Sequence, residues 1–199
     1  SDIATVTVVV NDQPDAGSNG TITVCSDDAP FALFDELNGT PGGGGTWKDP
    51  LNATHNGIYI PGVSDPGVYT YTITGSAPCA NDAATVTVIE NVLPDAGSPN
   101  VLSVCSDELP FQLIDKLLGT PDVGGSWVGP GGAFPGTYVP GSSAPGIYTY
   151  TVAGLSPCPS ASAAVTILEN TAPDAGISTA VPVCDDTAPF PLIDLLAGT

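Results

Sequence analysis

The feature that most limits what this chain can fold into is a repeat of about 80 residues. The tetrapeptide Pro-Asp-Ala-Gly occurs at residues 14–17, 94–97 and 173–176, so successive copies begin 80 and 79 residues apart. The chain's two Trp residues and six Tyr residues follow the same period and fall into matching pairs. A fixed period of this length indicates a tandem array of similar structural units.

The repeat also predicts the domain boundaries. The segment Ala-Thr-Val-Thr-Val at residues 4–8 matches residues 84–88, which close a repeat. We therefore expect residues 1–11 to be the last strand of a preceding repeat. Residues 12–91 and 92–170 are then two complete repeats, and residues 171–199 are the start of a further, truncated one.

Short segments with alternating apolar and polar residues predict β-strands within each repeat. In residues 68–74, Tyr69, Tyr71 and Ile73 fall on one face and threonines on the other. Pro-Gly turn signals at 66–67 and 145–146 precede this strand in both repeats. About seven short strands per repeat are typical of an Ig-like β-sandwich, and nothing in the pattern predicts parallel strands. The expected fold class is all-β: tandem Ig-like β-sandwich repeats of about 80 residues.

One apolar segment of each repeat departs from the alternating pattern and predicts a short helix. Asp27 or Asp28 could cap its start, and Gly39 suits its end. We expect this helix to pack across one end of the sandwich; an irregular apolar loop would bury the same side chains. The apolar positions at helical spacing are Phe31, Leu33, Phe34 and Leu37, then Phe111, Leu113, Ile114 and Leu117, then Phe190, Leu192, Ile193 and Leu196.

The cysteines predict one disulfide bond in each repeat. Each complete repeat holds two cysteines, so the economical pairing is Cys25 with Cys79 and Cys105 with Cys158. The partner of Cys184 would then lie beyond the truncation. Pairing of Cys79 with Cys105, across a repeat boundary, is the alternative. Disulfide bonds place the protein outside a reducing cytosol, so we expect an extracellular location.

The charge of the chain excludes several classes of partner. It has 21 acidic residues against two lysines, Lys48 and Lys116, for a formal net charge of −19. Nucleic acid and anionic membrane surfaces should be repelled, because binding them requires clustered basic residues. No apolar run approaches the roughly 20 residues that a membrane helix needs, so this segment is not expected to insert into a membrane.

Three aspartates are candidate calcium ligands. Asp15, Asp95 and Asp174 occupy the Pro-Asp-Ala-Gly segments at the junctions between repeats, where carboxylate oxygens could hold calcium. The simpler interpretation is that each Asp stabilises a turn. Because no EF-hand pattern is present, we expect no cofactor, with calcium as the alternative.

The side chains needed for catalysis are sparse. His55 is the only histidine and has no counterpart in the second repeat, so we interpret it as a surface loop residue. There is no nucleophile elbow and no phosphate-binding loop. Trp47 and Trp127 could stack on sugars, although core positions near a disulfide fit an Ig-like domain better. We therefore expect no enzymatic activity.

Taken together, the motifs resemble a known group of repeats. Their order is Pro-Asp-Ala-Gly (14–17), Val-Cys-Ser-Asp (24–27), Gly-Thr-Pro (39–41), a glycine run before Trp47, and Pro-Gly-Val-Tyr-Thr-Tyr-Thr (66–72). This order is similar to the Ig-like or PKD-like repeats of giant cell-surface proteins of Bacteroidota, which the type 9 secretion system exports and which include gliding-motility adhesins. The resemblance covers the whole chain. Asp186-Thr187-Ala188 also looks like an O-glycosylation acceptor motif of these bacteria, with Thr187 as the acceptor.

The resemblance implies a surface-anchored filament that contacts surfaces or other cells. We accordingly expect a structural stalk that spaces an adhesive tip from the cell, with neighbouring repeats of the same chain as its main partners. One alternative is a module that binds glycans or abiotic surfaces, and exposed, repeated aromatic residues would favour it. The other is a spacer attached to a secreted enzyme.

Overall fold

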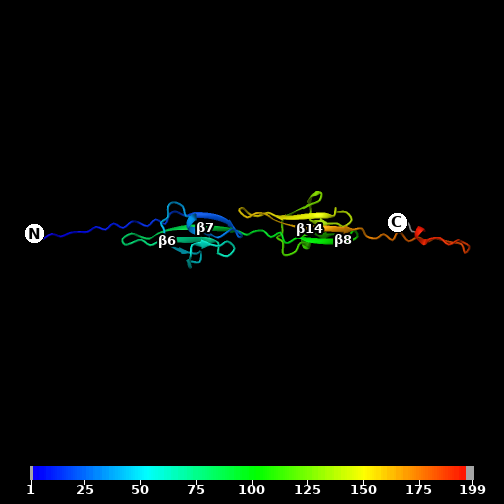
Figure 1. The fold of residues 1–199 in the computed structure, drawn as a ribbon, viewed down its shortest axis with the longest axis horizontal. Helices are drawn as coiled ribbons and strands as arrows, with labels where there is room; N and C mark the ends of the chain where they lie inside the picture. Colours follow the sequence, from blue (N-terminus) through cyan, green and yellow to red (C-terminus); the bar gives the residue numbers. More distant parts are fainter. Residues whose placement is uncertain (1, 196–199) are drawn as a thin grey trace. The chain divides into compact units, whose positions relative to one another are not determined.

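The structure, a computed structural model, describes residues 2–195, and its contacts divide the chain into two compact units (Figure 1). The first unit comprises Ser1–Ala96, Asp122–Gly125 and Thr151–Ser162. The second comprises Gly97–Pro121, Ser126–Tyr150 and Ala163–Thr199. The units therefore do not coincide with the sequence repeats, because Thr151–Ser162 of the second repeat belongs to the first unit.

The first repeat forms a sandwich of one five-stranded sheet and one two-stranded sheet. The large sheet has the order β1-β7-β6-β3-β4, and β2 pairs with β5 in the small one. This order places β7, β6 and β3 together as the G, F and C strands of an Ig domain, with β2 and β5 in the places of B and E. The strands are β1 (Gly20–Cys25), β2 (Phe31–Ala32), β3 (Thr46–Lys48), β4 (Thr54–His55), β5 (Ile58–Tyr59), β6 (Gly67–Ile73) and β7 (Asp82–Asn91).

The second repeat forms the same sandwich. Its large sheet has the order β11-β10-β13-β14-β8, and β12 pairs with β9. The strands are β8 (Asn100–Cys105), β9 (Phe111–Gln112), β10 (Ser126–Gly129), β11 (Gly132–Phe134), β12 (Thr137–Tyr138), β13 (Gly146–Val152) and β14 (Ala161–Asn170). Both sandwiches confirm the expected all-β, Ig-like fold class.

The expectation that no strands run parallel is wrong. β1 pairs in parallel with β7, with Gly20 opposite Val86 and Cys25 opposite Asn91, and β8 pairs in parallel with β14. More than 50 residues separate the two partners in each repeat, long enough for the chain to cross the sandwich and return in the same direction. Alternation in the sequence predicts a strand and its buried face, but it does not indicate which strand lies beside it.

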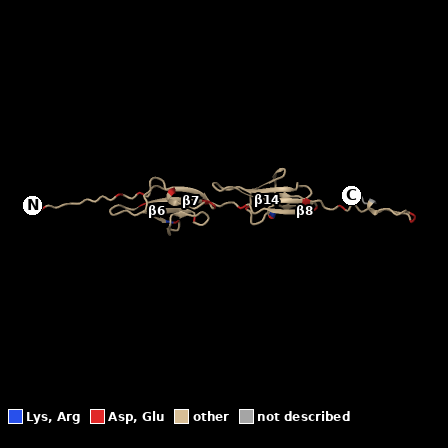
Figure 2. Ribbon diagram, in the orientation of Figure 1, with Lys and Arg blue, Asp and Glu red and all other residues tan. Residues whose placement is uncertain are grey.

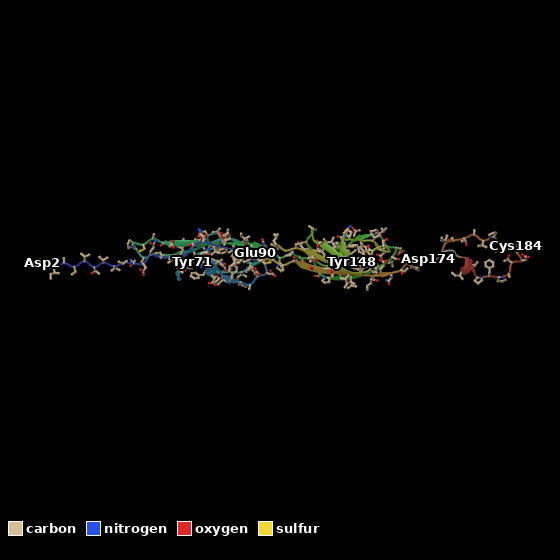
Figure 3. The ribbon with its side chains drawn as sticks, turned by 90° about the horizontal axis from the view of Figure 1, so that it is seen from above. Asp2, Tyr71, Glu90, Tyr148, Asp174 and Cys184 are labelled. Atoms are coloured by element: carbon tan, nitrogen blue, oxygen red, sulfur yellow. A yellow bond between two sulfur atoms is a disulfide. The ribbon has the colours of Figure 1, made fainter. Side chains whose placement is uncertain are left out.

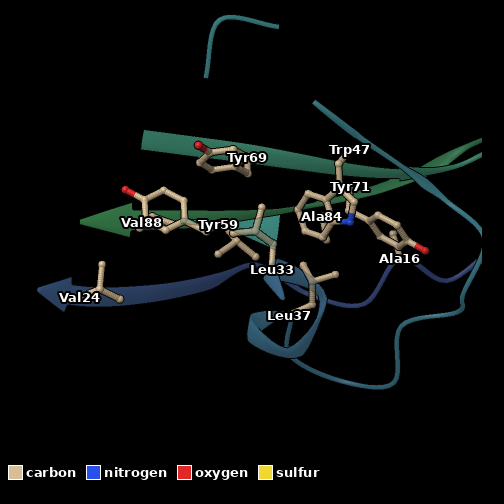
Figure 4. Packing of buried hydrophobic residues seen from close by; sticks show 11 residues of the cluster. Ala16, Val24, Leu33, Leu37, Trp47, Tyr59, Tyr69, Tyr71, Ala84 and Val88 are labelled. Atoms are coloured by element: carbon tan, nitrogen blue, oxygen red, sulfur yellow. The ribbon is translucent and has the colours of Figure 1, made fainter. Parts of the chain in front are cut away.

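Tyrosine and tryptophan side chains fill the core of the first sandwich (Figure 4). Trp47 on β3 lies opposite Tyr71 on β6, with their ring centroids 5.0 Å apart. Tyr69 is buried two residues earlier on the same face, as the alternation predicts. Its hydroxyl donates to the carbonyl of Asp65 at 2.7 Å, and Tyr148 does the same to Ala144 at 2.6 Å. This bond, from a tyrosine near the start of the strand to the carbonyl four residues before it, is the tyrosine corner found in Ig domains.

The expected helix is a single 3-10 turn in each repeat. The turns are η1 (Leu33–Glu36), η2 (Ile114–Lys116) and η3 (Leu192–Leu195). η1 begins late because Phe31–Ala32 pair with β5 as strand β2, and it has no side-chain cap. Leu33 and Leu37 are nevertheless buried, as the spacing predicts. Leu196, the last position of the third predicted helix, lies outside the described residues.

Neither end segment adds a strand to these sheets. Residues 2–11 carry no strand, and residues 171–195 carry no strand beyond the single bridge residue Ile177 and contain the turn η3. The assignment of residues 1–11 to a preceding repeat and of 171–199 to a further one therefore stays a prediction. Strands β1 to β7 all lie within residues 12–91, and β8 to β14 within residues 92–170.

Candidate functional site

The candidate site is a disulfide bond that joins the two sequence repeats. Cys25, the last residue of β1, bonds Cys158 in the loop between β13 and β14, with their Cα atoms 4.9 Å apart. Both cysteines belong to the first compact unit. The expected pairs, Cys25–Cys79 and Cys105–Cys158, are therefore wrong. The alternative pair Cys79–Cys105 is not formed either, since Cys79, Cys105 and Cys184 are free thiols.

The parallel pairing of β1 with β7 explains why the bond cannot form within a repeat. Cys25 lies opposite Asn91, the last residue of β7, whereas Cys79 precedes Asp82, the first residue of that strand. A ten-residue strand is about 30 Å long. A disulfide needs Cα atoms within about 7 Å, so Cys25 and Cys79 lie at opposite ends of the sheet. The same register separates Cys105, opposite Asn170, from Cys158.

The bond is buried and held on both sides by backbone contacts. Cys25 is 1% exposed and Cys158 is 5% exposed. The backbone N–H of Cys25 donates to a carboxylate oxygen of Asp28 at 2.7 Å. The Sγ of Cys158 lies 3.2 Å from the carbonyl oxygen of Asn91, whose side-chain amide donates to the Ser156 carbonyl at 2.8 Å. Asp28 and Asn91 thus fix the loop on each side of the bond, and neither role is visible in the sequence.

Two of the three candidate calcium ligands, Asp15 and Asp174, serve as turn residues. A side-chain oxygen of Asp15 accepts from the Gly17 backbone N–H at 2.8 Å, and Asp174 does the same for Gly176 at 2.7 Å (Figure 3 labels Asp174). The turn needs glycine, because Gly17 has φ +81° and a Cβ there would lie 2.6 Å from the Asn38 carbonyl oxygen. The backbone N–H of Asp95 donates to Asp122 at 2.9 Å. These contacts support the turn interpretation, and calcium binding stays a prediction.

Within residues 2–195, one cluster brings together three side chains of metal-binding type: Cys25, Asp27 and Cys158. Two of them are the disulfide cysteines. A cysteine binds metal through its thiolate, so a bonded pair leaves Asp27 as a single carboxylate ligand. Among the described residues, this cluster does not include Asp15, Asp95 or Asp174.

A hydrogen bond between a buried tyrosine and a half-buried glutamate supports the same end of each sandwich, and sequence reasoning missed it. The Tyr59 hydroxyl donates to Glu90 at 2.8 Å, and the Gly62 backbone N–H donates to the same oxygen at 3.1 Å (Figure 3 labels Glu90). In the second repeat Tyr138 donates to Glu169 at 2.6 Å. Glu90 and Glu169 occupy matching places near the ends of β7 and β14, so the repeat itself was the available signal.

These pairs predict a loss of stability at alkaline pH. Burial, followed by the hydrogen bond to Glu90, raises the pKa of Tyr59 above its usual value of 10.0, and burial and Glu169 likewise raise the pKa of Tyr138. Below about pH 10 both tyrosines are protonated whether the chain is folded or unfolded. Above that pH the unfolded chain loses these protons first, so the free energy of unfolding should fall as pH rises.

Urea denaturation at intervals from pH 8 to 12 measures this effect. Each tyrosine can contribute a slope of at most about 1.4 kcal/mol per pH unit. The double variant Tyr59→Phe, Tyr138→Phe should lose stability less steeply above pH 10 than the unaltered chain. Equal slopes for the two proteins would contradict the role assigned to these hydroxyls.

The two tryptophans lie inside the sandwiches, and the histidine is half-buried on a strand. Trp47 and Trp127 are each 7% exposed, which confirms the core role and leaves no exposed stacking surface. Trp47 does not lie near the disulfide, since it pairs with Tyr71, Tyr71 pairs with Ala84, and Ala84 is seven residues from Asn91 along β7. His55 is not a loop residue but part of β4, opposite Trp47. Its Nδ1 accepts from the Gly57 backbone N–H at 3.1 Å.

Two further features bear on glycosylation and ligand binding. Thr187 is exposed, and its hydroxyl oxygen accepts from the backbone N–H of Cys184 at 3.0 Å. Glycosylation at this residue stays a prediction. A shallow pocket beside the β10–β11 hairpin is lined by glycines, Pro130, Ala133, Phe134, Ala144 and Tyr148. The one titratable side chain in this lining is the phenol of Tyr148, which also forms the tyrosine corner.

Charge and hydropathy limit the surfaces available to partners. Acidic residues lie on strands, loops and connecting segments alike (Figure 2), and Lys48 and Lys116 are the two basic residues of the chain. The surface therefore lacks the basic cluster that nucleic acid binding requires. None of the helical turns in the described part of the chain is long and apolar enough to cross a membrane.

Several solved structures of Ig-domain proteins are similar to this chain. An I-band fragment of titin aligns with a TM-score of 0.48 at 11% identity, over 77% of this chain and 64% of the fragment. The four N-terminal Ig domains of Dscam1 isoform 6.9 align with a TM-score of 0.47 at 14% identity, over 83% of this chain and 48% of that structure. The insect immune protein hemolin aligns with a TM-score of 0.46 at 14% identity, over 79% and 46%. The chain thus spans less than two thirds of the length of each structure.

No protein-family model matches the sequence, and no curated protein matches it. The class of domain therefore follows from the chain's own topology and contacts. Sheet order, tyrosine corner and buried tryptophan define two Ig-like β-sandwiches, and a disulfide bond joins their sequence repeats.

Proposed function

We propose that this chain is a segment of the stalk of a large extracellular adhesin and spaces an adhesive tip from the cell surface. The observation that carries the proposal is the disulfide bond between Cys25 of one repeat and Cys158 of the next. A bond within a domain stabilises that domain alone. A bond between successive repeats also protects the residues between its cysteines from extension, because tension passes directly through the two sulfur atoms.

Other contacts support a structural role over a catalytic one. His55 accepts a backbone hydrogen bond and packs against Tyr69, with the ring centroids 4.9 Å apart. It is therefore a structural residue of β4 rather than a candidate base. The net charge of −19 favours solubility and mutual repulsion of long arrays.

The proposal also includes the setting in which the stalk acts. A buried disulfide fits an oxidising compartment, so we place the protein outside the cell and at its surface. The motifs suggest a Bacteroidota protein exported by type 9 secretion, with a role in adhesion or gliding motility and with O-glycosylation at Thr187. Its main partners are neighbouring repeats of the same chain, and its tip would contact surface glycans or abiotic surfaces.

Small-angle X-ray scattering tests the stalk. The proteins to compare are this chain and a tandem duplicate of residues 12–170, both oxidised. The stalk predicts that the maximum dimension grows by a constant step for each added repeat. An increase in the radius of gyration with only the cube root of chain length would mean that the repeats collapse together, and would reject the stalk.

A glycan-binding module is the rival function, and it lacks an aromatic platform because Trp47 and Trp127 are buried. Specific binding to a glycan array at micromolar concentration, abolished by substitutions around the Phe134 pocket, would favour the rival. We expect no binding.

The stalk is expected to be independent of calcium. The side chains of Asp15 and Asp174 already accept backbone hydrogen bonds in their turns, so we predict the same melting temperature in millimolar calcium and in EDTA. A bound ion present at 100 times its dissociation constant would add about 2.7 kcal/mol of stability, which calorimetry would detect as a higher melting temperature. Such a rise, abolished by Asp15→Asn, would show that calcium binds at this junction.

A further inference from the structure

We propose that the free cysteines Cys79 and Cys105 are each one half of the same kind of bond as Cys25–Cys158. Cys79 would bond the first cysteine of a preceding repeat, and Cys105 the second cysteine of a following repeat. The disulfides would then form a staggered series in which each bond begins before the previous one ends. This inference rests on the proposed function, because it requires an array of such repeats.

Cys79 has the surroundings of Cys158. The Sγ of Cys158 lies 3.2 Å from the carbonyl oxygen of Asn91, and the Sγ of Cys79 lies 3.5 Å from the carbonyl oxygen of Asn11. The Asn91 side chain donates to Ser156 at 2.8 Å, and the Asn11 side chain donates to Ala77 at 2.7 Å. Asn11 precedes Asn91 by one repeat, as Ala77 precedes Ser156. The loop around Cys79 is thus already arranged as the bonded loop is.

Cys105 has the surroundings of Cys25. The backbone N–H of Cys25 donates to Asp28, and that of Cys105 donates to Glu108 at 2.9 Å. The next residues, Ser26 and Ser106, each donate through the backbone to the last residue of the paired strand, Asn91 or Asn170, at 2.9 Å. Their hydroxyls each accept a backbone N–H at 2.9 Å, from Leu93 and Ala172.

The two matching cysteines, Cys25 and Cys105, differ in what covers their side chains. Cys25 is 1% exposed because it is bonded to Cys158, whereas Cys105 is exposed. The Asn91 side chain donates to the loop that carries Cys158, but the Asn170 side chain turns back to the Ser103 hydroxyl at 3.0 Å. The missing component beside Cys105 is therefore a loop of the Ser-Pro-Cys type, such as the loop at residues 156–158. We therefore infer that the partner of Cys105 is another repeat of the same kind.

Bond formation is an ordinary thiol–disulfide exchange. The two thiols lose two protons and two electrons as the sulfur–sulfur bond forms. A small-molecule disulfide such as oxidised glutathione accepts them and is released as two thiols. In the cell, a thiol–disulfide oxidoreductase in its disulfide form would serve as the oxidant.

The test extends the full chain by one repeat. A second copy of residues 92–170 is inserted after Asn170, which raises the number of cysteines from five to seven, since the repeat contains Cys105 and Cys158. The protein is oxidised with glutathione disulfide. Free thiols are counted in denaturant, and linked peptides are mapped by mass spectrometry without reductant. The unextended chain provides the reference and should show three free thiols, those of Cys79, Cys105 and Cys184.

The proposal predicts two disulfides and again three free thiols in the extended chain, with Cys105 linked to the inserted copy of Cys158. The matched variant Cys105→Ser should leave the inserted Cys158 free and keep the Cys25–Cys158 bond. Five free thiols, or a bond between Cys105 and the Cys158 of its own repeat, would overturn the proposal. Scattering remains an independent readout: a constant length step without the second bond would reject the staggered series and retain the stalk.

Discussion

Replacing both Cys25 and Cys158 by serine is expected to lower the free energy of unfolding by about 5 kcal/mol. The bond closes a loop with a sequence separation of 133 residues, and in the chain-entropy model the stabilisation grows with the length of the closed loop. Urea denaturation of the oxidised protein measures the loss. The matched control is Cys79→Ser, Cys105→Ser, which changes the same two repeat positions where they are free thiols. This control should retain the stability of the unaltered chain.

The Cys25→Ser, Cys158→Ser variant and its control should also differ in how far they extend under tension. When the oxidised chain is pulled from its ends, residues 26–157 lie behind the bond and cannot extend, which withholds roughly 450 Å of contour length. Single-molecule force spectroscopy should recover this length in the Cys25→Ser, Cys158→Ser variant, or after a reductant is added. The Cys79→Ser, Cys105→Ser control should stay short. Full extension of the oxidised control would show that the Cys25–Cys158 bond is not formed.

Trp47→Ala is expected to cause the second large effect, a loss of about 3–5 kcal/mol in the free energy of unfolding of the first sandwich. The ring packs on Tyr71 and on the backbone of Gly57, where a Cβ would lie 2.8 Å from the ring's Cδ1 atom. Strand pairing on both sides of β3 holds the backbone in place, so the cavity cannot collapse. Trp127→Ala makes the matched change in the second sandwich, where the ring lies 4.9 Å from Tyr150.

Circular dichroism and fluorescence together measure these losses, because each variant keeps one tryptophan in the unaltered sandwich. Circular dichroism should show an early unfolding transition in the Trp47→Ala protein, and the fluorescence of Trp127 reports on the second sandwich alone. Val63→Ala, at an exposed position of the first repeat, should change stability by less than about 0.5 kcal/mol. A loss below 1 kcal/mol for Trp47→Ala would mean that the ring is not part of the core.

The sequence predicts the repeated sandwich well because the signals for it are local. Tyr69 and Tyr71 alternate with threonines, and both are buried on one face of β6 as that pattern requires. The short apolar segment around Leu33 is buried as its spacing predicts, but its first two residues pair with β5 instead of entering a helix. Strand pairing across the sandwich overrides the local helical spacing, and no local pattern reveals such a pairing.

The candidate site is less predictable because it depends on which strands are neighbours. Counting two cysteines in each repeat favours Cys25–Cys79, and this pairing fails because β1 runs parallel to β7 and places the two residues at opposite ends of the sheet. In addition, Tyr71 stands two residues after the corner tyrosine, at the position of the strand F cysteine of antibody domains. Since Tyr71 packs against Trp47 there, the core has no place for the usual disulfide, and the cysteines are free to serve another purpose.

The bond between Cys25 and Cys158 also changes what a protease can do to this protein. A single backbone cut anywhere in residues 26–157 leaves two fragments that remain covalently joined, so the outer part stays attached to the inner part. If the bonds overlap as we propose, every peptide bond inside a long array lies beneath at least one of them. A single cut would then separate the filament only where every disulfide that spans the cut is also reduced. For a protein exposed to extracellular proteases, these second covalent links would slow the loss of the filament without lengthening the chain.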